Sequence, residues 1–170
     1  TNYVKNFTWG EIVVENKCVE PKPPAQQLGG ASRIMSLNPT QDFVRTFFTP
    51  RSPYKGLLLF HSVGTGKTCS AIATATSSFE QEGYTILWVT RTTLKSDVYK
   101  NMFDDVCHLV LAEKMKQGLI MPEDLTRRKK LLSKNWIEPI SYKTFSNLLT
   151  PGAHNEYMDK LIQRNGATDI

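Results

Sequence analysis

The fold is decided by residues 56–68, which read Gly-Leu-Leu-Leu-Phe-His-Ser-Val-Gly-Thr-Gly-Lys-Thr. The apolar run at 56–60 is typical of a strand that is buried on both faces of a parallel sheet. The residues after it match the phosphate-binding pattern G-x-x-x-x-G-K-[ST], except that His61 stands at the first position. Because only the outermost glycine is replaced, we expect a phosphate-binding loop. The alternative is a glycine-rich turn that merely joins a strand to a helix.

The loop contains the groups that a nucleotide phosphate needs. Gly64 and Gly66 allow the backbone to curl so that successive N–H groups point inward. The helix expected to begin near Lys67 adds free N–H groups and the positive end of its dipole. Lys67 can reach the β- and γ-phosphates, and Thr68 can offer a hydroxyl to Mg²⁺. We assign catalytic roles to these last two residues, and nucleotide binding to Val63, Gly64, Thr65, Gly66, Lys67 and Thr68.

Segments with strand and helix patterns alternate after the loop. The expected elements are a helix at 69–80, a buried strand at 85–90, a helical face from 94 to 110, a strand at 137–141 and helices at 143–149 and 155–164. This alternation predicts an α/β fold in which helices flank a parallel sheet. Ligands in such folds bind at the carboxyl ends of the strands.

The N-terminal residues differ from the rest of the chain. Residues 7–20 have a weak strand pattern, and the prolines and glycines at 21–30 predict a linker or arm. Asn38, Pro39 and Gln41 then form the pattern of a helix start with a capping box. We therefore divide the chain into an arm at 1–36 and an α/β domain at 37–170.

Composition narrows the classes of protein. Apolar residues make up 40% and charged residues 22% of the 170, which is a globular balance. No apolar run reaches membrane-spanning length and the first residues lack a signal-peptide core, so we expect an intracellular protein without a membrane partner. The net charge of +5 fits either a polyanionic partner or an ordinary basic surface. The run at 127–130, expected between elements, is open to the same two interpretations.

The three cysteines, Cys18, Cys69 and Cys107, are far apart and form no C-x-x-C pair. Their spacing predicts neither a zinc site nor a disulfide framework. Cys107 and His108 are expected to be helix residues. The scarcity of cysteine favours a reducing compartment.

Several segments together resemble a known family. They are 37–44 (LNPTQDFV), 50–68 (PRSPYKGLLLFHSVGTGKT), 89–103 (VTRTTLKSDVYKNMF) and 136–147 (WIEPISYKTFSN). These segments are similar to the N-terminal part of superfamily 2 helicases, in particular the poxvirus-type group of large nucleocytoplasmic DNA viruses. The resemblance spans about residues 36–165. It implies a RecA-like P-loop domain that uses ATP and Mg²⁺ and binds a DNA or RNA backbone. It also implies a location in the host cytoplasm or the virion, with viral transcription or virion proteins as candidate partners.

The resemblance also implies roles for individual residues. Gln41 would read the adenine of ATP, although the same side chain could simply complete the helix cap. Thr90, Arg91, Thr92 and Lys95 would contact the nucleic-acid backbone, and hydroxyls and cations do suit phosphate oxygens. The alternative is that Thr92 or Thr93 caps the next helix.

Hydrolysis by a P-loop enzyme needs a second acidic site, normally a Walker B strand that ends in Asp-Glu. Asp104 and Asp105 lie in a helical pattern, and Asp169 follows polar and small residues. We therefore expect the chain to be truncated before the Walker B strand, and inactive by itself.

Two hypotheses follow. The first is the ATP-binding part of a helicase or nucleic-acid-dependent ATPase that acts in transcription or genome handling. The second is a non-catalytic, helicase-like virion component that retains the loop. A GTPase would carry an N-K-x-D motif, which is absent from the sequence, and a small kinase would need an arginine-bearing lid.

Overall fold

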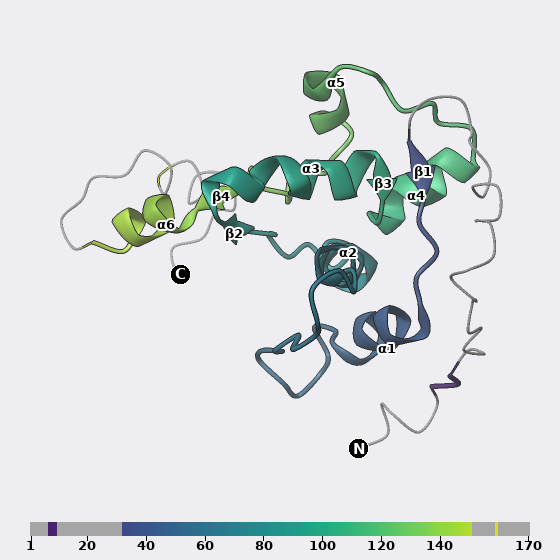
Figure 1. Ribbon diagram of the computed structural model, residues 1–170, viewed down its shortest axis with the longest axis horizontal. Coiled ribbons are helices and arrows are strands. Elements are labelled where there is room, and N and C mark those ends of the chain that lie inside the picture. The colour runs from purple at the N-terminus through teal and green to yellow at the C-terminus, as the bar shows by residue number, and fades with distance from the viewer. Residues whose placement is uncertain (1–6, 10–31, 151–158, 160–170) are drawn as a thin grey trace.

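The computed structural model describes residues 7–9, 32–150 and 159, which form a mixed α/β arrangement (Figure 1). Its α-helices are α1 (Pro39–Phe47), α2 (Lys67–Thr74), α3 (Lys95–Phe103), α4 (Leu109–Lys116), α5 (Leu125–Lys129) and α6 (Tyr142–Leu148). Its strands are β1 (Arg33–Ile34), β2 (Val89–Thr90), β3 (Asp105–Val106) and β4 (Ile140–Ser141). A π-helical turn at Ala75–Phe79 continues α2, and a 3₁₀ turn at Thr92–Leu94 precedes α3. None of the helices in this part of the chain is long and apolar enough to cross a membrane.

The strands form two short parallel pairs. β1 pairs with β3, with Arg33 opposite Asp105. β2 pairs with β4, with Thr90 opposite Ser141, and a bridge between Ile86 and Trp136 extends this pair toward its amino end. The parallel direction agrees with the alternation in the sequence, but β2 and β4 are shorter than the strands predicted at 85–90 and 137–141. The helices predicted at 69–80 and 143–149 are confirmed as α2 with its π-helical turn and as α6.

The buried strand predicted at 56–60 is wrong for the described chain. These residues have no strand assignment, and the side chains of Leu58 and Phe60 are 82% and 91% exposed. A strand is stabilised by ladder hydrogen bonds to a neighbour. Within the described ranges no segment pairs with residues 56–60, so an apolar sequence alone does not produce the strand.

The long helical face predicted from 94 to 110 is also wrong. α3 ends at Phe103, and the next two residues after Asp104 form β3 before α4 begins. The Arg33 N–H donates to the Asp104 carbonyl at 2.7 Å, and the Met35 N–H donates to the Val106 carbonyl at 3.2 Å. Pairing with a distant N-terminal segment therefore interrupts the helix. Asp105 consequently belongs to a strand, where the sequence pattern indicated a helix.

The core lies among α2, α3 and α4 and contains the disulfide between Cys69 and Cys107. Its fully buried members include Ile72, Met102, Phe103, Leu111 and Met115. The spacing of the cysteines did not predict this disulfide, because the fold brings together two residues that are 38 positions apart. Cys107 is also not a helix residue, since it lies between β3 and α4.

His108 is the N-cap of α4 and was wrongly predicted to lie within a helix. Its Nδ1 accepts a hydrogen bond from the Leu111 N–H at 3.4 Å, and its Nε2 lies 3.4 Å from Glu80 Oε2. Burial lowers the pKa of His108 to about 4. The ring is therefore neutral at pH 7, which leaves Nδ1 free to accept.

The remaining predictions concern the start of α1, the basic run at 127–130 and the two ends of the chain. The helix start at Asn38 is confirmed by α1. The basic run at 127–130 does not lie between elements, because most of it belongs to α5. The helix predicted at 155–164 and most of the strand predicted at 7–20 lie outside the described residues.

Candidate nucleotide site

The glycine loop connects an extended segment to the first turn of α2. Gly64 and Gly66 have φ values of +83° and +79°, in the left-handed region that favours glycine. Gly66 is the N-cap of α2, and no side chain caps this helix. The first N–H groups of a helix have no partner within the helix, and they carry the positive end of its dipole. The loop and the start of α2 can therefore receive an anion.

Gly66 is also closely approached by the side chain of Gln41. A Cβ atom at this position would lie 2.6 Å from Gln41 Nε2. The Gly66 carbonyl accepts hydrogen bonds from Gln41 Nε2 at 3.2 Å, from the Ser70 N–H at 2.9 Å and from Ser70 Oγ at 3.1 Å. Only glycine satisfies both the backbone conformation and the close approach of α1.

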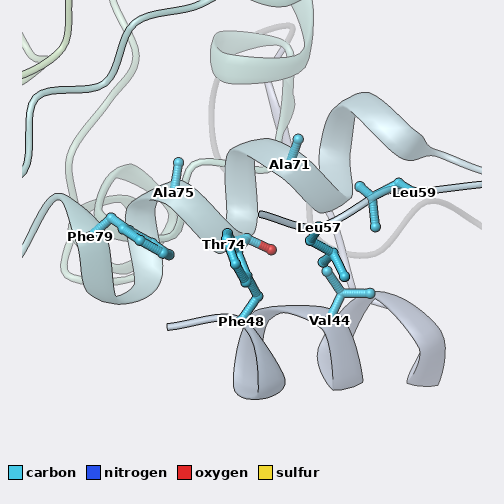
Figure 2. Close-up of a pocket in the computed structure, with 8 residues that line it drawn as sticks. All are labelled: Val44, Phe48, Leu57, Leu59, Ala71, Thr74, Ala75 and Phe79. Atoms are coloured by element: carbon cyan, nitrogen blue, oxygen red, sulfur yellow. The ribbon is translucent and has the colours of Figure 1, made fainter. Parts of the chain in front are cut away.

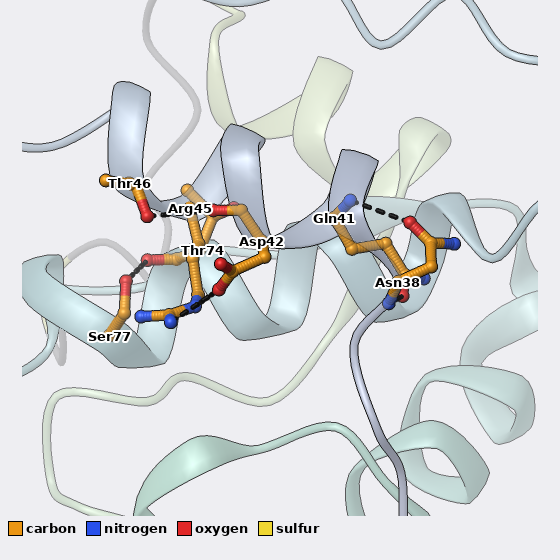
Figure 3. A network of polar contacts seen from close by, with 7 residues as sticks. All are labelled: Asn38, Gln41, Asp42, Arg45, Thr46, Thr74 and Ser77. Carbon is orange, nitrogen blue, oxygen red and sulfur yellow. Dashed lines mark hydrogen bonds and ion pairs between the residues drawn. The ribbon is translucent and has the colours of Figure 1, made fainter. Parts of the chain in front are cut away.

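Gln41 forms the capping box of α1 with Asn38 (Figure 3) and also contacts this loop. Its N–H donates to Asn38 Oδ1 and its Oε1 accepts from the Asn38 N–H, both at 2.9 Å, so the capping box is complete. Its remaining amide group, Nε2, is the one that reaches Gly66. The capping role of Gln41 is thus confirmed, and its role as an adenine reader stays a prediction.

A cavity of about 410 Å³ lies beside the loop. Its lining combines the start of α1 with the loop, namely Asn38, Thr40, Gln41, Phe60, His61, Ser62 and Thr65. Six of the seven lining residues are polar and Phe60 is the apolar one, and a cavity of this size can hold a small ligand. The cavity therefore lies directly beside the glycine loop and the start of α1.

The ammonium group of Lys67 lies across the loop. Its Nζ donates to the carbonyls of His61 at 3.0 Å and Ser62 at 2.8 Å. These contacts place the positive charge at the start of α2, where it adds to the dipole. The first position of the motif contributes its backbone carbonyl to Lys67, which explains how histidine can replace glycine there.

Thr68 and Thr90, predicted to bind Mg²⁺ and nucleic acid respectively, line one pocket of about 90 Å³. Asp97, in the first turn of α3, lines the same pocket. Asp97 was not among the predicted site residues, although its place in the first turn of a helix that follows a strand end was an available signal. No group of three or more His, Cys, Asp or Glu side chains forms a metal site within the described ranges.

The residues predicted to contact nucleic acid lie between the end of β2 and the start of α3. Thr90 is buried, Arg91 and Thr92 are exposed, and Lys95 is half-buried. Neither Thr92 nor Thr93 caps a helix, because the N-cap positions are occupied by Arg91 and Leu94, without a side-chain hydrogen bond. The alternative of a purely capping role for these threonines is therefore wrong.

A second cavity near the site is apolar. Figure 2 shows it between α1 and α2, where side chains of both helices and of the segment at 57–59 converge. It encloses about 260 Å³, and its lining is Val44, Phe48, Leu57, Leu59, Ala71, Thr74, Ala75 and Phe79. The only side-chain polar atom in the lining, Thr74 Oγ1, already donates to the Ser70 carbonyl at 2.8 Å. This cavity offers no group for binding a phosphate.

Together these features define a mixed α/β protein with a glycine loop at an uncapped helix start. No family model and no solved structure matches the chain. It is 51% identical over 35 residues to "Putative ATP-dependent RNA helicase R563" of Acanthamoeba polyphaga mimivirus, which covers 21% of this chain and 6% of that protein. It is 46% identical over 41 residues to "Putative helicase 009L" of Frog virus 3, which covers 24% of this chain and 4% of that protein. These short matches support a relationship to viral helicases, and the chain aligns with only a small part of either relative.

Proposed function

We propose that this chain is the ATP-binding part of a viral helicase or nucleic-acid-dependent ATPase of the superfamily 2, poxvirus-type group. The observation that carries the proposal is the start of α2, where Gly64 and Gly66 adopt positive φ and no side chain occupies the cap. Lys67 adds a cation at the same place. The short matches to viral helicases favour ATP over other phosphate ligands.

The residues of the loop fit Mg²⁺-ATP. The backbone from Val63 to Thr68 would surround the phosphates, Lys67 would exchange its carbonyl partners for phosphate oxygens, and Thr68 would face the metal ion. The cavity beside Gln41 would take the base. Bound Mg²⁺ would neutralise phosphate charge, and the protein would hold the phosphates in position.

The shared pocket of Thr68 and Thr90 suggests how the two functions are coupled. A change in the contacts of Thr68 would therefore alter the position of the end of β2. Arg91, Thr92 and Lys95, which follow this strand, would bind a DNA or RNA backbone. The proposed places of action are the host cytoplasm and the virion.

The decisive experiment is a titration of Lys67→Ala with a fluorescent ATP analogue. We expect at least a tenfold loss of affinity, since one charge-assisted contact to phosphate contributes about 1.5–3 kcal/mol. Lys114→Ala, which removes an exposed lysine from α4, is the matched control. Equal affinities of the two variants would refute the nucleotide site.

The nucleic-acid role is tested separately with Arg91→Ala. We expect weaker binding of an oligonucleotide and a shallower dependence on salt, because a phosphate contact releases counterions. Binding that ignores both salt and this substitution would contradict the role while leaving the nucleotide site intact.

The second candidate function is a non-catalytic virion component that retains the loop. Hydrolysis would need a carboxylate pair at a strand end. In the described part of the chain, β2 and β4 end in Thr90 and Ser141 and carry no such pair, which favours the non-catalytic candidate. Steady ATP turnover by the purified chain, lost in Lys67→Ala, would exclude this candidate.

A further inference from the structure

A cationic cavity lies away from the glycine loop, where α3, α5 and the segment at 131–138 meet. It encloses about 400 Å³, and the polar side chains that line it include Tyr99, Lys129, Lys130, Lys134, Trp136 and Glu138. An ion pair of 2.6 Å between Arg128 and Asp104 fixes α5 against the end of α3. The basic run that the sequence left open therefore forms one wall of a defined cavity.

The cations of this cavity are not balanced by its one carboxylate. Lys129 Nζ donates to Glu138 Oε1 at 2.8 Å and lies 4.6 Å from the centre of the Tyr99 ring. The hydrogen bond with Lys129 lowers the pKa of Glu138 and raises the pKa of Lys129. This pair is neutral as a whole, which leaves the charges of Lys130 and Lys134. Within the described residues neither lysine has an ion-pair partner.

The lining also contains an unused donor. Trp136 is only 5% exposed, and its indole Nε1–H has no acceptor within the described part of the chain. A buried donor without an acceptor is unfavourable.

The cavity continues the row of cations that begins at the proposed backbone contact. Lys95 and Tyr99 are four residues apart, so they lie on the same face of α3. Lys95 is also near enough to Glu138 to lower the pKa of that carboxyl group, after the larger effect of Lys129. A row of cations from Lys95 to Lys134 matches repeated phosphates better than a single one.

We propose that this cavity is a second phosphate site for a single nucleic-acid strand, whose backbone runs from Lys95 along α3 to Lys130 and Lys134. This inference rests on the proposed nucleic-acid role and extends it to residues outside the strand ends. The lysines neutralise backbone phosphates, and the site does not distinguish bases.

The test is the salt dependence of binding of a labelled single-stranded oligonucleotide, followed by fluorescence anisotropy. For the double variant Lys130→Gln/Lys134→Gln we expect the slope of log affinity against log salt to fall by about 0.7 per lost phosphate contact, or roughly 1.4 in total. The control is Lys114→Gln/Lys116→Gln, which removes the same charge from α4 and should keep the slope of the unmodified chain.

A third variant acts in the opposite direction. Glu138→Gln keeps the shape of an exposed side chain but frees Lys129 from its ion pair. We expect tighter binding and a slope steeper by about 0.7, because Lys129 becomes available to one more phosphate. A general effect of net charge would not depend on where the charge is changed, whereas a cavity effect does.

The outcomes separate this inference from the proposed function. If the unmodified chain binds the strand but both double variants have equal slopes, the cavity proposal is overturned and the contact near Arg91 stands. If the unmodified chain binds no strand while it still binds ATP, both nucleic-acid proposals fail and the nucleotide site stands. A phosphoserine peptide of equal charge that displaces the strand as well as a second oligonucleotide does would overturn the assignment to nucleic acid.

Discussion

Helices α1 and α2 lie against each other (Figure 1), yet their first turns are completed in different ways. The start of α1 is closed by its own side chains, because Asn38 and Gln41 satisfy each other's backbone N–H groups. The start of α2 has a glycine at the cap and no side-chain acceptor. A glycine cap costs only a few tenths of a kcal/mol relative to a polar one, so the fold can leave this helix start available to a ligand.

The two helix starts also depend on each other through the contact between Gln41 Nε2 and the Gly66 carbonyl. α1 therefore does more than cover α2, because its capping box orients the side chain that lies over the loop. The capped start of α1 thus positions a side chain beside the uncapped start of α2. Substitutions at either helix start test this dependence.

The largest effect is expected from Gly66→Ala. The new methyl group would impose strain at φ +79° and lie 2.6 Å from Gln41 Nε2, which must move away. We expect ATP binding to become undetectable in a calorimetric titration. Gly64→Ala is the matched control, because it has a similar φ of +83° but open space around the methyl group. Equal losses in both variants would mean that only backbone strain matters and that the approach of Gln41 does not.

The next effect concerns the disulfide that joins Cys69, in the first turn of α2, to Cys107, between β3 and α4. Closing a loop between positions 38 residues apart restricts the unfolded chain and stabilises the fold by about 2–4 kcal/mol. We expect a reductant to lower the free energy of unfolding in urea by this amount. Cys18→Ser should show the same loss on reduction, and a chain insensitive to reductant would exclude the disulfide in solution.

The N-cap of α4 is His108, a residue that titrates. The pKa of His108 is lowered from 6.5 to about 4 by burial, so the unfolded chain binds more protons than the folded chain between these values. The contribution of neutral His108 to stability is therefore complete above pH 6.5 and is lost as the pH falls from 6.5 to 4, by up to roughly 3 kcal/mol. Urea titrations from pH 7 to pH 4 measure this loss.

The control for the acid effect is His108→Asn, since asparagine caps helices without titrating. Its stability should be flatter over the same pH range. An unchanged slope would assign the acid effect to groups other than His108.

These helix starts also differ in how well the sequence predicts them. The capping box of α1 and the glycine loop of α2 depend on residues within a few positions of one another, so their patterns were sufficient. The end of α3 depends on hydrogen bonds from Arg33 and Met35 to a distant segment. The apolar periodicity continues through that point, which is why a single long helix was predicted.

The parts of the site that sequence did not predict are likewise those made by distant residues. Asp97 and Thr68 line one pocket, and Gln41 touches Gly66, only because the chain folds back. The disulfide has the same origin. A motif identifies the groups that a ligand needs, but tertiary contacts decide which side chains surround them.

The smallest effect separates the two roles of Gln41. Asn38→Ala and Gln41→Ala both destroy the capping box, so each should cost about 1 kcal/mol of stability. Only Gln41→Ala also removes the hydrogen bond to Gly66, so only this variant should weaken ATP binding, by a few-fold. If Asn38→Ala weakens ATP binding equally, the loop responds to the position of α1 as a whole and not to the amide of Gln41. If Gln41→Ala keeps both the affinity and the preference for adenine, the side chain is a helix cap alone, and the base is read by other residues of the cavity beside it.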